Sequence, residues 1–307
     1  MKGVEMKRVL RSIISSLHGQ TRKLLKGTFA ENLPGARTLN DFLFWHLRAK
    51  EDYINIQGSK IYVNPEGLPR RFACLFKEHI ITGIWEELTT ALFMRAIKEG
   101  DIVVDIGANI GYFTLLASRL VGDNGKVFAF EPEPVNFSLL VKNIEENGYK
   151  NVISVQKCVA KTTGTVRLFV DEGCALTHSI CKHGDSEHSI EIEAVSLDDF
   201  FLEKEHPINI VKIDIEGAEM EALLGMDKWI RQNKDLKIFT EFYPALMKEA
   251  GYTVEEFARK VFQEWHFSVT AIDDYSNDKR YIRVSSIDEL MALFKVPVQF
   301  LNLLLER

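Results

Sequence analysis

Two glycines, an acid and an amide meet where an apolar strand is predicted to pass into a helix, in the segment "DIGANIG" (105–111). Gly107 and Gly111 allow a tight turn and let a ligand approach the backbone without meeting a Cβ atom. The helix that begins near Gly111 offers unpaired N–H groups, which attract an electron-rich group such as a carboxylate. Because ligands bind at the carboxyl ends of the strands in open α/β sheets, the segment predicts a ligand-binding turn.

A second acid follows at the expected distance from this turn. Glu131 lies twenty residues beyond Gly111, at the end of the apolar strand "VFAFE" and directly before Pro132. A carboxylate at such a strand end accepts hydrogen bonds from both hydroxyl groups of a ribose. Together, the turn and Glu131 predict a nucleoside cofactor.

The spacing of the glycines narrows the choice of cofactor. A dinucleotide site needs G-x-G-x-x-G, in which the second glycine makes room for pyrophosphate and the third allows close helix–strand packing. Counted from Gly107, these places hold Asn109 and Tyr112, so NAD or FAD would fit poorly. S-adenosylmethionine has no phosphate, and Asn109 can bond its amino-acid end. We therefore predict S-adenosylmethionine, with a nicotinamide-dependent oxidoreductase and a non-catalytic nucleoside-binding scaffold as alternatives.

Asp214 and Glu216 are predicted to end the buried strand in "NIVKIDIEGAE". The two-residue period of a strand predicts that both side chains point to the same face at the carboxyl edge of the sheet. Methyl transfer depends mainly on positioning, and a hydroxyl acceptor must also lose its proton. We predict that Asp214 acts as this base or orients the acceptor and that Glu216 supports it. The alternative for either acid is to cap the helix expected to start at Gly217.

No metal site is expected. Asp214 and Glu241, at the end of "IFTEF", could hold Mg²⁺, but the sequence offers no obvious third ligand. The loop "CALTHSICKHGDSEH" (174–188) contains cysteines and histidines, but their spacing matches no zinc finger or ribbon. His178 is a candidate accessory base or acceptor contact, although a solvated loop histidine is the favoured interpretation.

The elements that must position these residues alternate between strands and helices from Asp101 onward. This order predicts an α/β fold with a parallel sheet and right-handed crossovers. The segments "FSVTAID" and "YIRVSS" are expected to close the sheet as a pair of strands. The predicted division is an N-terminal helical and hairpin extension (1–98), a Rossmann-like domain (99–286) and a C-terminal amphipathic helix (287–307). Within the extension, the pattern predicts a basic amphipathic helix over 1–26, a hairpin around Gly58 and a helix over 85–98.

Composition limits the class of protein. The chain has 307 residues and a net charge of −6, so no overall basic field favours nucleic acid. It has no apolar run long enough for a transmembrane helix and no secretory signal pattern, and its four cysteines suit a reducing compartment. We expect a cytoplasmic enzyme with a small-molecule or glycan acceptor. Its amphipathic ends are compatible with a homodimer, and the basic N-terminal helix with contact to a membrane surface.

The chain resembles the FkbM family of methyltransferases. The resemblance lies in "GDIVVDIGANIGYFTLLAS", "VFAFEPEPVNFSLLVKNIEENG", "NVISVQKCVAKTTGTVRLFV" and "VKIDIEGAEMEALLG", and extends over about 86–267. It implies a seven-stranded, mostly parallel Rossmann-like sheet of class I methyltransferases, with an antiparallel strand near one edge, and methyl transfer to an oxygen of a small-molecule or glycan acceptor. It also implies cofactor roles for several residues: Asp105, Gly107, Asn109 and Gly111 on the methionine side, Glu131 at the ribose, and Asn136, Cys158 and Val159 on the adenine side.

Overall fold

The computed structural model describes residues 53–62, 84–170, 178–181, 188–202, 207–276, 278–293 and 300–307. The predicted helix over 1–26 lies outside this part of the chain. Across the described residues, no helix combines the length and the apolarity needed to cross a bilayer.

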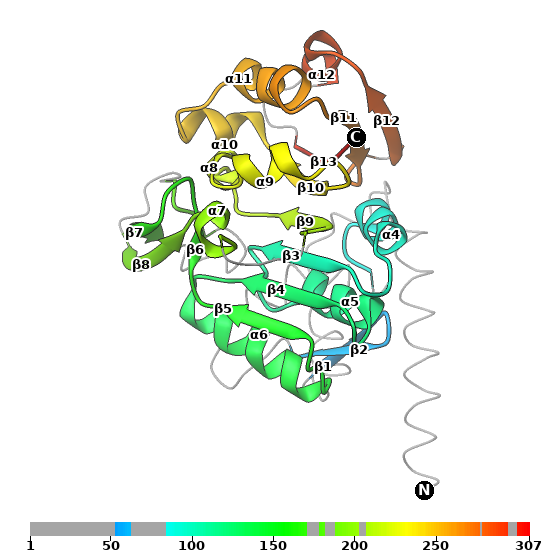
Figure 1. The fold of residues 1–307 in the computed structure, drawn as a ribbon, viewed down its shortest axis with the longest axis vertical. Helices are drawn as coiled ribbons and strands as arrows, with labels where there is room; N and C mark the ends of the chain where they lie inside the picture. The colour runs from blue at the N-terminus through cyan, green and yellow to red at the C-terminus, as the bar shows by residue number, and fades with distance from the viewer. Residues whose placement is uncertain are drawn as a thin grey trace, which may run out of the picture.

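An eight-stranded sheet forms the centre of the molecule, in the order β12-β11-β13-β10-β9-β3-β4-β5 (Figure 1). Strands β3, β4, β5, β9 and β10 are parallel, whereas β13 is antiparallel to both of its neighbours, β10 and β11. This arrangement confirms the predicted α/β, Rossmann-like sheet with an antiparallel strand near one edge. The sheet has eight strands rather than the seven that the resemblance implied, because β12 pairs with β11 as a further antiparallel strand at the edge. The strands are β3 (Ile102–Ile106), β4 (Lys126–Phe130), β5 (Val152–Val155), β9 (Ile210–Ile213), β10 (Lys237–Phe242), β11 (Ser268–Asp273), β12 (Arg280–Val284) and β13 (Leu301–Glu306).

The antiparallel strand corrects the prediction for the C-terminus. The expected amphipathic helix over 287–307 is present only as α12 (Ile287–Leu293), and Leu301–Glu306 form β13 instead. Residues 301–305 are buried between β10 and β11. An apolar run buried on both faces belongs in a central strand, and its sequence alone does not distinguish it from a buried helix.

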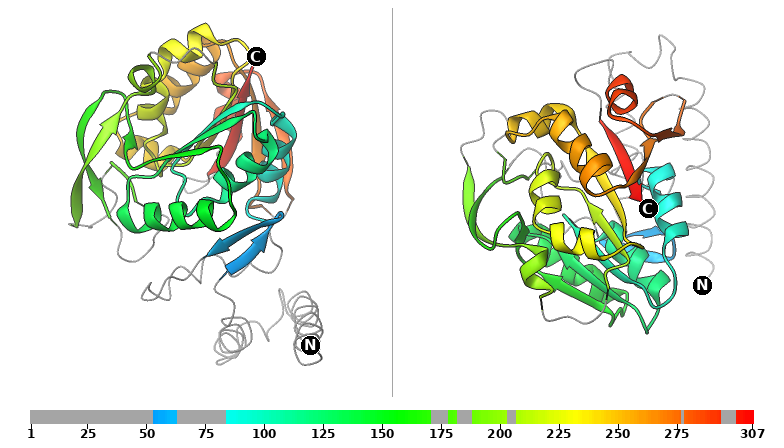
Figure 2. Two further views of the ribbon diagram at one scale, coloured as in Figure 1. Left: turned by 60° about the horizontal axis from the view of Figure 1, so that its bottom comes forward. Right: turned by 45° about the horizontal axis from the view of Figure 1, so that its top comes forward.

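Helices cover both faces of the sheet, because its strands are apolar on both sides. Val103 packs in one core and its neighbour Val104 in the other. One core is closed by α4 (Glu87–Ala96), α5 (Tyr112–Val121) and α6 (Pro134–Glu146), and the other mainly by α8 (Glu219–Leu224), α9 (Asp227–Gln232), α10 (Pro244–Glu249) and α11 (Val254–Arg259). In the right view of Figure 2, α4 and the orange helices lie on opposite sides of the red strand β13.

Two smaller sheets flank this core. The predicted hairpin is confirmed as β1 (Tyr53–Ile56) and β2 (Ser59–Tyr62), and β2 contacts α6 through Asn143, whose Oδ1 accepts from the Tyr62 N–H at 2.7 Å. The second sheet contains β6 (Cys158–Val159), β7 (Gly164–Phe169) and β8 (Ser189–Val195). The segment "VISVQKCVA" is therefore divided between two sheets, since β5 ends at Val155.

Candidate active site

The glycine turn lies between β3 and α5, directly against the chain that leaves β9. Gly107 has φ +80°, and a Cβ atom added there would lie 1.9 Å from the backbone oxygen of Asp214. Gly111 has φ 102° and occupies the N-cap of α5 without a side-chain cap. Gly107 is thus required for the close approach of two backbone segments, and both glycines adopt a conformation that L-residues disfavour.

Glu131 is held in place by backbone groups from both sides. Its Oε2 accepts from the Asn109 N–H at 2.8 Å, and its Oε1 accepts from the Glu133 N–H at 2.9 Å. The side chain is 5% exposed, and burial raises its pKa from 4.5 to about 8 against the opposing effect of these two hydrogen bonds. The sequence predicted that Asn109 would bond the cofactor. In the structure its backbone, at φ 50°, also fixes the acid predicted to bind the ribose.

Asp105 connects the strand to the helix that follows. Its Oδ2 accepts from Thr114 Oγ1 on α5 at 2.5 Å, and burial raises its pKa to about 6. The predicted contact of Asp105 with the methionine end stays a prediction.

A small, partly open pocket lies beside the turn, at the carboxyl ends of β3 and β4. Among the predicted cofactor residues, Gly107, Cys158 and Val159 line it. His178 lines it as well, so the structure places this histidine with the predicted adenine-side residues. Asn136 lies at the start of α6, where its N–H donates to the Glu133 carboxylate, and it does not line the pocket. Much of the remaining lining is apolar, including Ile106 and Phe130.

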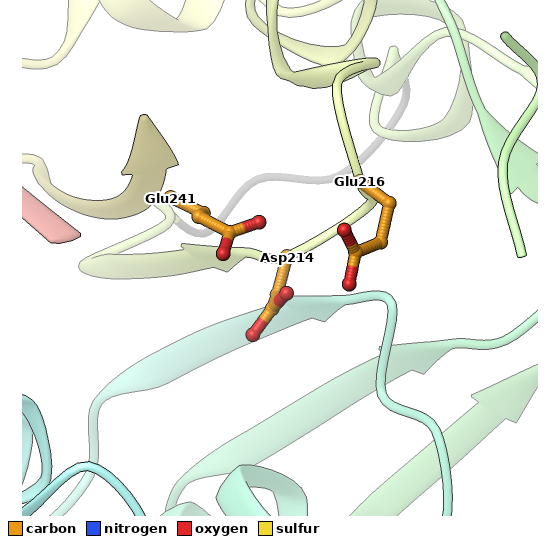
Figure 3. A group of neighbouring side chains, drawn as sticks. All are labelled: Asp214, Glu216 and Glu241. Atoms are coloured by element: carbon orange, nitrogen blue, oxygen red, sulfur yellow. The ribbon is translucent and has the colours of Figure 1, made fainter. Parts of the chain in front are cut away.

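A cluster of three carboxylates lies at the ends of β9 and β10. Asp214, Glu216 and Glu241 each present a ligand atom within 4.8 Å of the other two. Figure 3 shows Glu216 and Glu241 on either side of Asp214, with their carboxylates directed towards it. The sequence placed Asp214 beside Glu216 and, in a separate argument, near Glu241, but it did not bring the three acids together as one set of ligands. The structure therefore supplies the third acid whose absence led us to expect no metal.

Glu216 reaches this cluster by a turn, which corrects the argument from strand periodicity. Strand β9 ends at Ile213, and Glu216 has a left-handed backbone with φ 51°. Neither acid of the predicted pair caps the following helix: α8 begins at Glu219, and its N-cap, Ala218, makes no side-chain cap. Instead, Glu219 Oε1 accepts from the Gly217 N–H at 3.1 Å.

Lys212 faces the acids from inside the core. Its ammonium group is 0% exposed, lies 2.9 Å from Asp214 Oδ2 and stands 4.9 Å from the centre of the Phe113 ring. Burial by itself would lower the pKa of Lys212, but the charges of Asp214, Glu86 and Glu241 raise it above its usual value. Sequence reasoning missed this residue, because one lysine in an apolar strand gives no signal of the acids that face it.

Burial leaves Glu216 and Glu241 with raised pKa values despite the nearby charge of Lys212. Burial and the charge of Asp214 raise the pKa of Glu216 to about 8, and the same two causes raise that of Glu241 well above its usual range. Glu86 extends the acidic region from the start of α4, where its Oε1 accepts from the Tyr275 hydroxyl at 2.5 Å. The pKa of Glu86 is raised mainly by burial. The sequence gave no reason to select Glu86 or Tyr275.

Comparison with known proteins agrees with this architecture. The model of the methyltransferase FkbM domain matches residues 105–285. "Methyltransferase 1" of Beauveria bassiana is 28% identical over 149 residues, which cover 42% of this chain and 59% of that protein. "Hexuronic acid methyltransferase AglP" of Haloferax volcanii is 29% identical over 164 residues, which cover 50% of this chain and 65% of that protein.

A crystal structure of methyltransferase FkbM from Methylobacillus flagellatus aligns with a TM-score of 0.40 and 13% identity, over 79% of this chain and 56% of that one. The chain spans 59% and 65% of the two curated relatives described above. The family model extends over more than half of the chain and includes the turn, Glu131 and the three carboxylates. This protein therefore belongs to the FkbM family of methyltransferases.

Proposed function

We propose that this protein transfers a methyl group from S-adenosylmethionine to a hydroxyl oxygen of a small-molecule or glycan acceptor. The observation that carries the proposal is the setting of Glu131. Two backbone N–H groups hold its carboxylate beside the glycine turn, and the adjacent pocket is largely apolar. A carboxylate fixed in this way has acceptor capacity left for a ribose diol.

The residues present fit this cofactor. Cys158 and Val159, both at most 4% exposed, offer the pocket a compact apolar wall suited to an adenine ring. The turn carries Asn109 where a dinucleotide site needs a glycine, so it favours a nucleoside without phosphates. Membership of a methyltransferase family also counts against the nicotinamide alternative.

The carboxylates after β9 and β10 provide the chemistry on the acceptor side. When bound, the cofactor supplies an activated methyl group: the bond to the acceptor oxygen forms, the methyl–sulfur bond breaks with its electron pair left on sulfur, and the hydroxyl proton is released. Asp214 is proposed to orient that hydroxyl or take its proton, with Glu216 beside it. Lys212 fixes the Asp214 carboxylate through Oδ2. His178 lies in the pocket wall, and its role as an accessory base or acceptor contact remains a proposal.

Two features favour a hydroxyl-bearing acceptor. Carboxylates accept hydrogen bonds from hydroxyl groups, and the Asp214 side chain is 31% exposed, so an acceptor can reach it. One relative is named for methylation of a hexuronic acid, a sugar derivative. An O-methylated glycan or a related polyhydroxylated compound is therefore the proposed class of product.

Calorimetry with S-adenosylhomocysteine, and with NADH in parallel, tests the cofactor assignment. We expect S-adenosylhomocysteine to bind, and Glu131→Gln to weaken its binding about tenfold or more above pH 8, where the Glu131 carboxylate is charged and accepts the ribose hydroxyls more strongly than a neutral amide does. Glu264→Gln, which removes an acid that is ion-paired with Lys260 away from the pocket, is the control and should bind as the unmodified protein does. Tight NADH binding without S-adenosylhomocysteine binding would refute the assignment.

Label transfer from the methyl donor into glycan and metabolite extracts identifies the acceptor. Asp214→Asn is expected to lose turnover of that acceptor while its S-adenosylhomocysteine affinity stays within about twofold. Full turnover by this variant would remove Asp214 from the proposed role.

A further inference from the structure

The three carboxylates at the ends of β9 and β10 have a geometry that suits a single ion. Mg²⁺ holds oxygens at about 2.0–2.1 Å and Ca²⁺ at about 2.3–2.6 Å, so two oxygens on opposite sides of one ion lie about 4–5 Å apart. The ligand atoms of Asp214, Glu216 and Glu241 all lie within 4.8 Å of one another. They come from two neighbouring strand ends and converge on one point (Figure 3).

Glu241 supplies an independent sign that something is bound there. Its side chain is 8% exposed, and among the described residues its Oε2 has no hydrogen-bond partner. A buried carboxylate oxygen without a partner costs free energy, because it has lost water and gained nothing in exchange. Glu241 points towards Asp214 and Glu216, so a ligand between the three would satisfy it.

The balance of charge indicates that this ligand is a cation. Lys212 contributes one positive charge and is already bonded to Asp214. Glu216 and Glu241 add two further acids, whose ligand atoms lie within 4.8 Å of that of Asp214. A divalent ion would offset the mutual repulsion of these carboxylates at short range.

We propose that Asp214, Glu216 and Glu241 bind one divalent, oxygen-preferring cation of the Mg²⁺ or Mn²⁺ class. Three carboxylates without a nitrogen or sulfur ligand favour such hard ions over zinc or copper. Asp214 and Glu216 are partly exposed, so the remaining coordination positions can be filled by water or by acceptor oxygens.

This site deepens the proposed function and rests on it for its purpose. A cation that binds an acceptor hydroxyl lowers the pKa of that hydroxyl, and two adjacent hydroxyl groups of a glycan could bind it together. The site thus selects acceptors with neighbouring oxygen ligands. With Asp214 as a ligand of the cation, its role is to orient the acceptor hydroxyl, and the released proton passes to water.

Titration of the chelator-treated full chain with MnCl₂ tests this inference, with binding followed by calorimetry and by the relaxation of water protons. We expect one Mn²⁺ per chain, with relaxation enhanced by water on the bound ion and MgCl₂ competing for the site. Glu241→Gln is expected to weaken Mn²⁺ binding about tenfold or more. Glu264→Gln removes the same charge from an ion pair with Lys260, outside the cluster, and is expected to bind Mn²⁺ normally.

Thermal unfolding separates a metal ligand from a merely structural residue. Without metal, Glu241→Gln should unfold at the same temperature as the unmodified protein or higher, because it relieves repulsion among the acids. It should also lose the rise in unfolding temperature that MnCl₂ gives the unmodified chain. No binding of Mn²⁺ by the unmodified protein at about 5 mM would overturn the inference, as would unchanged binding by Glu241→Gln.

Binding of S-adenosylhomocysteine in the presence of EDTA keeps the two proposals apart. If S-adenosylhomocysteine binds in EDTA but the separate titration shows no Mn²⁺ binding, the proposed metal site is wrong and the proposed cofactor stands. If Mn²⁺ binds but S-adenosylhomocysteine does not, the proposed function fails and the metal site stands.

Discussion

Replacement of Gly107 by alanine tests the close contact between the glycine turn and the backbone of Asp214. This contact joins the proposed cofactor side of the site to its proposed acceptor side. The new Cβ atom would lie 1.9 Å from the Asp214 carbonyl oxygen, whereas real Cβ contacts are essentially never shorter than 3.0 Å. The two segments must therefore separate by about 1 Å. That movement strains the hydrogen bond from the Asp214 N–H to the Ile106 carbonyl, now 3.0 Å long, at the end of the β3–β9 pairing.

A matched control variant separates the contributions to the loss in the free energy of unfolding. Alanine at a left-handed position costs about 1–2 kcal/mol, and overpacking typically adds about 1–3 kcal/mol. A weakened backbone hydrogen bond adds about 1 kcal/mol. Gly148, after α6, has φ +72° with no atom within 4 Å of an added Cβ, so Gly148→Ala meets only the conformational cost. We expect Gly107→Ala to lose about 2–4 kcal/mol more than Gly148→Ala.

Urea unfolding of the two variants measures this difference, and calorimetry with S-adenosylhomocysteine measures its effect on the site. Gly107→Ala should weaken binding by at least about tenfold, because the turn and Asp214 both move, whereas Gly148→Ala should bind normally. Equal stability losses in the two variants, with cofactor binding intact in both, would refute the close packing of the turn against Asp214.

Three further predictions concern buried polar groups. Burial raises the pKa of Glu131 from 4.5 to about 8, so its contribution to stability is fully present below pH 4.5 and is lost as the pH rises through about 8. Glu131→Gln should therefore flatten the decline in the free energy of unfolding between pH 5 and pH 8, and an unchanged slope in urea melts would contradict the burial. Lys212→Met should cost about 3 kcal/mol or more, because it leaves buried carboxylates without their cation. Adding Glu241→Gln should restore part of that loss, and strictly additive losses in a double-mutant cycle would count against a shared charge cluster. Asn143→Leu should cost about 2 kcal/mol, because the Asn143 amide donates to the Ile110 carbonyl in the glycine turn at 2.7 Å and accepts from Tyr62 in the hairpin. A stability change below about 0.5 kcal/mol in urea melts would show that the hairpin does not brace the turn.

The local parts of the site could be predicted from sequence because they depend on neighbours in the chain. Gly107 and Gly111 are separated by three residues, and Glu131 ends the next strand. Adjacent parallel strands bring their carboxyl ends to one edge, so the turn and Glu131 were expected together, and Glu131 does accept from the Asn109 N–H. The hairpin at Gly58 and the strands β11 and β12 were likewise predictable from alternation and turn residues.

Assignments that depend on distant segments could not be made in this way. The run "LNLLLE" is apolar enough for a helix or a strand. It forms β13 because β10 and β11 both pair with its backbone. Glu216 lies beside Asp214 and Glu241 because its left-handed backbone turns the chain after β9 has ended. The two-residue period of a strand therefore predicted the contact between Glu216 and Asp214 correctly, although Glu216 is not part of the strand.

Sequence alone therefore determined the family, most of the order of strands and helices before β13, and the turn that faces Glu131, since these follow from short-range spacing and backbone preference. Only the tertiary structure decided which charges share one buried volume: Lys212 beneath the acids, Glu86 beside Tyr275, and three carboxylates around one point. The physical reason is that electrostatic interaction depends on distance and burial in space, and neither quantity is written in the separation of residues along the chain.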